Sequence, residues 1–172
     1  MRTIKNLVAI FYVCLMLPVI VSCGNDEERH PLNVYGNRMS ECLNDNYTRI
    51  TESLPRATYL VLKRDGNRID CQIQDFLWNC GLKFYASAEF DDKETLLINV
   101  SDKGESMDCT CYFNTYFYVE GAVFSHFHLK LKVTPASYDS RKPFILYDGD
   151  VELNDDEHVI ELPNPMGWTK ND

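Results

Sequence analysis

Apolar and polar residues alternate with a period of two along most of the chain from residue 58 onward, a pattern typical of half-buried β-strands. Two such runs flank Asp65-Gly66-Asn67, a tight-turn signal, and predict a hairpin over residues 58–74. Residues 82–90 and 95–100 predict a second hairpin. Further strands are expected over residues 109–120, 126–133, 144–147, 151–153 and 158–162.

The predicted strand 109–120 shows the clearest division between two faces. One face carries Cys109, Cys111, Phe113, Thr115, Phe117 and Val119. The opposite face carries Tyr112, Tyr116 and Tyr118, and tyrosines on an exposed sheet face are typical of surfaces that contact carbohydrate or protein. These three tyrosines are therefore the predicted binding residues. The alternative is that a second sheet or a loop packs over them.

Several short strands with turn signals at regular intervals predict an all-β fold, an antiparallel β-sandwich or an open barrel. Helical spacing is found only loosely, over Arg38 to Glu52. The expected organisation is a signal peptide at residues 1–22, a lipidated cysteine with a flexible acidic tether at 23–37, and one β-rich domain at 38–172.

The N-terminus has the three parts of an export signal. Arg2 and Lys5 precede an apolar run from Leu7 to Ile20, and a small residue, Ser22, ends the run. This run has about fourteen residues, whereas a helix that crosses a bilayer needs about twenty. The pattern therefore favours a cleaved signal over a permanent transmembrane helix.

The four residues Ile20-Val21-Ser22-Cys23 resemble the lipobox of bacterial lipoproteins. The resemblance implies that the Cys23 thiol receives a diacylglycerol group, that cleavage occurs before it, and that the new amino group takes a further acyl chain such as palmitate. Two or more acyl chains hold a protein firmly on a membrane. The alternative is a conventional secreted protein in which Cys23 is a structural thiol.

The acidic segment 24–28 after this cysteine resembles the surface-export signal of Bacteroidota lipoproteins, and a solvated linker accounts for it equally well. The expected location is thus the outer membrane, by a lipid anchor, with surface exposure left open. The formal net charge is −9, and loss of Arg2 and Lys5 with the signal makes it −11. Such acidity excludes nucleic acid as a partner. A protein or glycan partner is expected.

Seven cysteines are present, and five of them follow Cys23. In an oxidising compartment five cysteines form at most two disulfides and leave one thiol. Cys109 and Cys111 lie about 6.6 Å apart on one strand face with parallel side chains, so each is expected to pair across to a neighbouring strand. The predicted partners are Cys71 and Cys80, with Cys42 as the remaining thiol.

Other candidate chemistry is weaker. The spacing of the four disulfide candidates fits a Cys₄ zinc site poorly. His126-x-His128 is best explained as part of a solvated strand face. The acidic groups Asp91-Asp92, Asp148-Gly149-Asp150 and Asp155-Asp156-Glu157 are expected in solvated turns, although paired carboxylates are also what a glycoside hydrolase requires. We predict no catalytic residue, no metal and no cofactor.

The segment from Asp75 to Gly121 carries a second resemblance. Asn79-Cys80, followed by Asp108-Cys109-Thr110-Cys111-Tyr112-Phe113, is similar to small Bacteroidota lipoproteins grouped as NigD-like. The resemblance implies a β-sandwich lipoprotein without an established activity. The expected function is a non-enzymatic binding or structural module at the cell envelope. The alternatives are an envelope or glycan hydrolase using paired carboxylates, and a cysteine-based metal or thiol protein.

Overall fold

The computed structural model describes residues 29–43, 56–91, 94–122, 124–154 and 156–164. Within these ranges the regular structure consists of nine β-strands, in agreement with the predicted all-β fold. They are β1 (Arg29–Met39), β2 (Thr58–Asp65), β3 (Arg68–Asn79), β4 (Phe84–Asp91), β5 (Thr95–Asp102), β6 (Thr110–Glu120), β7 (His126–Thr134), β8 (Phe144–Glu152) and β9 (His158–Leu162).

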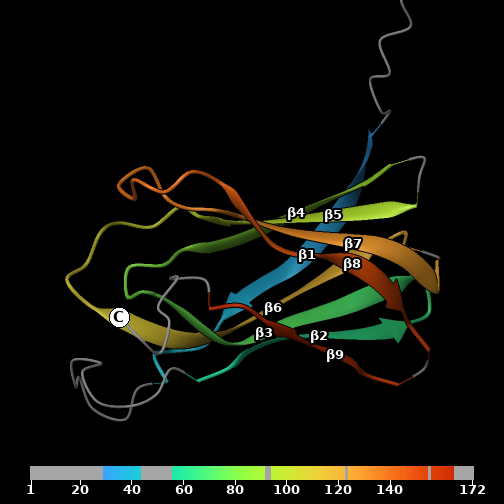
Figure 1. Ribbon diagram of the computed structural model, residues 1–172, viewed down its shortest axis with the longest axis horizontal. Helices are drawn as coiled ribbons and strands as arrows, with labels where there is room; N and C mark the ends of the chain where they lie inside the picture. The colour runs from blue at the N-terminus through green and yellow to red at the C-terminus, as the bar shows by residue number, and fades with distance from the viewer. Residues whose placement is uncertain (1–28, 44–55, 92–93, 123, 155, 165–172) are drawn as a thin grey trace, which may run out of the picture.

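The nine strands form one sheet in the order β8-β7-β5-β4-β1-β6-β3-β2-β9, which curls into a nearly closed barrel. All neighbouring strands are antiparallel except β5 and β7. Figure 1 shows the barrel as two layers, with β4, β5, β7 and β8 in one and β6, β3, β2 and β9 in the other. This architecture confirms the predicted sandwich or open barrel.

Strand β1 connects the two layers. Its first residues, Arg29 to Leu32, pair with β4, and Asn33 to Met39 pair with β6. Leu32 and Val34 pack against the core, so the strand buries apolar side chains while it satisfies the backbone groups of both neighbours. The prediction of a flexible tether up to residue 37 is therefore wrong from Arg29 onward. The tether residues 23–28 lie outside the described part of the chain.

The predicted helix over Arg38 to Glu52 is also wrong at its start, because Arg38 and Met39 end β1. Beyond the strand the backbone continues alongside β6: Ser40 N donates to Asn114 O at 2.8 Å, and Leu43 N donates to Tyr112 O at 3.0 Å. These bonds keep the segment extended. Residues 44–52 lie outside the described ranges.

The hairpin 58–74 is confirmed as β2 and β3, and Gly66 adopts the positive φ of 63° that the tight turn requires. Alternate residues of every strand point inward and form one core, as the period-two pattern predicts. Its largest fully buried side chains include Trp78, Phe76, Leu60, Leu62, Ile69, Ile73, Leu96, Ile98, Leu129 and Leu131. The second hairpin is confirmed as β4 and β5.

One predicted break is absent. Residues 144–147 and 151–153 were expected as separate strands around an acidic turn, but β8 runs without interruption from Phe144 to Glu152. Gly149 pairs with Leu129 of β7 within this strand. Asp148 and Asp150 consequently lie on the outer face of a strand, and their assignment to a solvated turn is wrong.

Candidate functional site

The outer face of β1, β6 and β3 brings together aromatic and planar polar side chains. Tyr35 and Tyr116 expose 44% and 37% of their surface, and Tyr118 is half-buried between them. The register places Tyr35 beside Tyr118, and Tyr118 beside Asp70. We call this surface the tyrosine face and define it by eight residues: Tyr35, Arg38, Asp65, Arg68, Asp70, Gln72, Tyr116 and Tyr118.

The aromatic centre of the tyrosine face depends on a bulge in β1. The register shifts between Tyr35 and Arg38, and Gly36 there has a φ of 69°. A Cβ on Gly36 would lie 3.2 Å from Cε1 of Tyr118, so the glycine lets the ring pack closely over the backbone. The rings of Tyr35 and Tyr118 are then 5.5 Å apart, within the range of favourable aromatic pairs.

Arg68 fixes the other side of Tyr118. Its guanidinium lies 5.0 Å from the Tyr118 ring centroid, in cation–π geometry. The same guanidinium contacts Asp70 through Nε and Nη2 at 3.1 and 3.2 Å, and contacts Asp65 at 2.9 Å. The hydrogen bond from Nη2 to Asp70, together with the ion contacts to both aspartates, restricts the orientation of the planar group. The side chains around Tyr118 are therefore positioned before any partner arrives.

Tyr116 is positioned by its hydroxyl. The hydroxyl oxygen accepts a 3.1 Å hydrogen bond from Nε2 of Gln72, which lies directly opposite on β3. Arg38 is the neighbour of Tyr116 on the β1 side and is exposed. The ring thus stands between a fixed amide and an exposed cation, with more than a third of its surface accessible.

The structure separates the three tyrosines predicted as binding residues. Tyr116 and Tyr118 belong to the tyrosine face, whereas Tyr112 is buried. Arg56 covers it: its backbone N donates to the Tyr112 hydroxyl at 3.0 Å and its guanidinium lies 5.2 Å from the ring centroid. Tyr112 is therefore not a surface residue. Sequence reasoning missed Tyr35, because β1 was expected to be a tether.

Within the described residues the cysteines form two disulfides, Cys42–Cys111 and Cys80–Cys109, each with a Cα separation of 5.6 Å. The expected count and the role of Cys80, Cys109 and Cys111 are confirmed. The remaining thiol is Cys71 and not Cys42, so that prediction was wrong. Because the four sulfurs are bonded in pairs, they are not available as thiolate ligands for a metal.

His128 occupies a second polar cluster, on the outer face of β7 and β8. Its Nδ1 lies 2.7 Å from Oδ1 of Asp150, and its Nε2 lies 2.5 Å from Oδ1 of Asp148. The hydrogen bond to Asp150 makes the largest contribution and the hydrogen bond to Asp148 the next, and both raise the pKa of His128. Asp148 also faces Nζ of Lys130 at 3.7 Å. The strand face around His128, which the sequence predicts to be simply solvated, thus carries a cluster of ion pairs.

The side chains of this cluster pair with one another across β7 and β8 and do not form a metal site. The two carboxylates lie on opposite sides of the His128 ring, so they cannot both join that ring around one metal ion. No three metal-ligating side chains converge anywhere in the described ranges. His126, the other residue of the His-x-His pair, faces Glu152 on β8 and is exposed.

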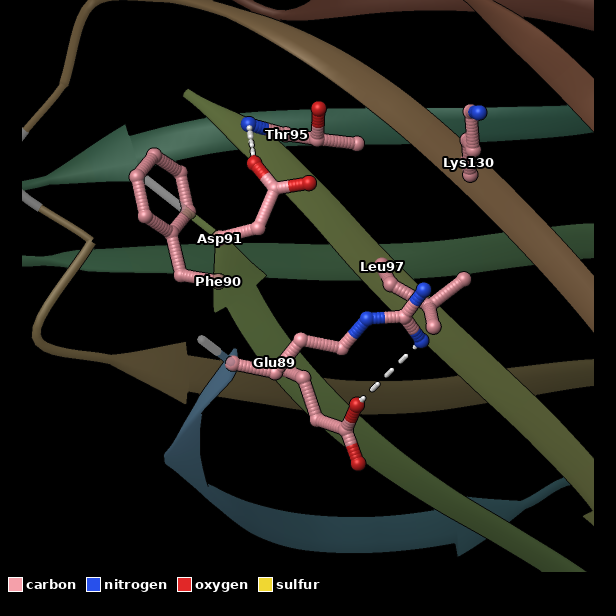
Figure 2. A pocket seen from close by; sticks show the side chains of 7 residues that line it. Glu89, Phe90, Asp91, Thr95, Leu97 and Lys130 are labelled. Carbon is pink, nitrogen blue, oxygen red and sulfur yellow. Dashed lines mark hydrogen bonds and ion pairs between the residues drawn. The ribbon is translucent and has the colours of Figure 1, made fainter. Parts of the chain in front are cut away.

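Figure 2 shows a shallow pocket on the outer face of β1, β4, β5 and β7. Its volume is about 60 Å³, much smaller than the roughly 300–1,000 Å³ of typical ligand sites. Both of its acids are engaged: Glu89 pairs with Arg29 at 3.8 Å, and Asp91 accepts a bond from Thr95 N at 2.8 Å. This pocket does not provide the cleft with two facing carboxyls that a glycoside hydrolase needs.

Cys23, the predicted lipidation site, lies outside the described residues. Across the described ranges, no helical segment has the length and apolar character needed to cross a bilayer. The two disulfides indicate an extracytoplasmic protein. Comparisons with protein-family models, with curated proteins and with solved structures each give no match.

Proposed function

We propose that this protein is a lipid-anchored binding module of the outer membrane, and that it engages its partner through the tyrosine face. The observation that carries the proposal is the preorganised set of rings on β1 and β6. Tyr35 and Tyr116 are large, partly exposed aromatic side chains, and their neighbours hold them in fixed positions. Rigid aromatic groups of this kind contribute contact area at a low cost in conformational entropy.

The anchor is supported by the sequence around Cys23 and by the oxidised cysteines. A lipobox-like tetrapeptide directly follows an apolar run of signal-peptide length. Disulfides persist in the oxidising spaces in which such lipoproteins reside. We expect Cys23→Ala to move the protein from the membrane pellet to the soluble fraction of lysed cells. Unchanged sedimentation would contradict the anchor.

Binding is tested with the full-length protein purified in detergent. The measurement is its retention on immobilised envelope fraction from the cells that produce it. The double variant Tyr35→Ala/Tyr116→Ala should lose retention, because it removes the exposed rings and keeps the backbone pairing. Tyr85→Ala is the matched control, since Tyr85 is 48% exposed but lies on β4 of the other layer. Equal retention of the double variant and wild type would refute the proposal.

A further inference from the structure

We infer that the tyrosine face binds a neutral glycan, an inference that rests on the proposed function and specifies its ligand. The first observation is the small exposed area of the three tyrosine rings. A tyrosine offers about 150–250 Å², and the exposed fractions are 44% at Tyr35, 37% at Tyr116 and less at Tyr118. The three rings therefore present at most roughly 300 Å², whereas a specific protein interface buries about 800 Å² on each partner. A few sugar units match the smaller area.

The second observation is charge. The protein carries a net charge of −9, whereas the tyrosine face contains two arginines and two aspartates. Its outward neighbours Lys63, opposite Asp70, and Glu120, opposite Arg68, add one charge of each sign, so this surface has no net charge. Arg68 is shared between Asp65 and Asp70, so these charges are satisfied within the face itself. A charged polymer finds no complementary field here. A neutral ligand leaves the ion pairs of Arg68 intact, and the exposed guanidinium of Arg38 can donate hydrogen bonds to it.

The third observation is the type of group beside each ring. Gln72 and Asp70 place an amide and a carboxylate next to the rings of Tyr116 and Tyr118, and Arg38 adds an exposed guanidinium. Planar groups of this kind donate and accept hydrogen bonds in pairs, which suits the adjacent hydroxyls of a sugar. The exposed large apolar side chains of the face, Tyr35 and Tyr116, are both aromatic, and a flat ring suits the C–H face of a pyranose.

The test divides the immobilised envelope fraction into three parts: untreated, oxidised with periodate, and digested with protease. Periodate cleaves the vicinal diols of glycans and leaves polypeptide chains intact. We expect wild-type protein to bind the untreated and protease-digested parts equally and to lose binding to the oxidised part. Binding should change little between 0.05 and 0.5 M NaCl, an increase that shortens the Debye length about threefold, because neutral ligands release no counterions.

The substitutions at Tyr116 sharpen this result. Tyr116→Ala should weaken binding to the digested fraction about tenfold, which corresponds to about 1.4 kcal/mol. Tyr116→Phe keeps the ring and should retain most of the affinity. Loss of binding after protease digestion, or persistence of binding after periodate oxidation, would show that the ligand is not a glycan, while the proposed binding face would stand. A steep fall with salt would overturn the neutral character. Equal binding by the Tyr35→Ala/Tyr116→Ala variant would reject the face itself.

Discussion

The indole Nε1 of Trp78 donates a 2.8 Å hydrogen bond to Oδ2 of Asp102, a carboxylate that is only 6% exposed. The same oxygen accepts a bond from the Tyr138 hydroxyl at 2.8 Å. The other oxygen accepts from the backbone N of Lys83 and of Gly104 at 3.1 and 2.7 Å. Four donors compensate the burial of this group and tie β3, β5, the start of β4 and the loop after β7 together.

Asp102→Ala should destabilise the fold by about 3 kcal/mol, because it leaves the buried indole N–H of Trp78 without an acceptor and removes the acceptor of the more exposed Tyr138 hydroxyl. Urea unfolding followed by tryptophan fluorescence measures this change. Asp156→Ala, at an exposed acid between β8 and β9, serves as the control and should stay within about 0.5 kcal/mol of wild type. An unchanged midpoint for Asp102→Ala would show that the carboxylate does not stabilise this end of the barrel.

Gly104 makes a second close contact in the same region. A Cβ built on it would lie 1.7 Å from the carbonyl oxygen of Gly81, so the two backbones pack directly on each other. Gly104→Ala should therefore cost about 3 kcal/mol in the free energy of unfolding. Gly66→Ala is a useful comparison, because nothing lies within 4 Å of that position and only the positive φ is strained, at about 1 kcal/mol. Equal effects of the two substitutions would contradict this packing.

The sequence pattern predicted which residues face inward, but it did not contain the register between strands. Cys71 lies on the inward face of β3, as expected, yet its neighbour across the sheet is Phe117 and not a cysteine. Cys42 reaches Cys111 because the chain after β1 continues alongside β6, where Leu43 N bonds to Tyr112 O. The free thiol is Cys71 and not Cys42, because the Cys42–Cys111 disulfide depends on β1 and the segment that follows it, which the alternation pattern does not reveal.

The candidate site shows the same limit. Tyr116 and Tyr118 were predicted because they alternate with buried residues in one long run, which local sequence displays directly. Tyr35 belongs to a strand that contains Pro31 and a bulge at Gly36, and both features weaken the alternation signal. The ion-pair cluster at His128 was missed because it forms only when β8 pairs with β7, two strands separated by a loop in the sequence.

Cys71 should be unreactive in the folded protein. Its side chain is buried, and burial, with a smaller contribution from the Asp70 carboxylate, raises the pKa of the thiol. Iodoacetamide at pH 8 should leave Cys71 unmodified in the native state and alkylate it after unfolding without reductant. Peptide mapping should then find Cys42 linked to Cys111 and Cys80 linked to Cys109. Rapid labelling of Cys71 in native protein, or a disulfide that includes it, would contradict the structure.

The stability of the β7–β8 pair should depend on pH through His128. The charged groups that face it are Asp148 and Asp150 on β8 and Lys130 on its own strand, while its neighbour on β5 is the uncharged Thr95. Only the doubly protonated ring can donate to both carboxylates. Because the folded-state pKa lies above the ordinary value of 6.5, the stabilisation is complete below pH 6.5 and is lost as the pH rises through the folded-state pKa.

The urea midpoint of wild-type protein should therefore fall as the pH increases from 6.5 through the raised pKa of His128, and His128→Gln should flatten that part of the profile. His126→Gln is the matched control, since His126 lies two residues away on the same face and is exposed. The pKa itself can be followed from the ring proton resonances of His128. The side chain is 34% exposed, so added salt should reduce the effect by screening. If the wild-type and His128→Gln profiles had the same slope, the two carboxylates would not be acting on the ring.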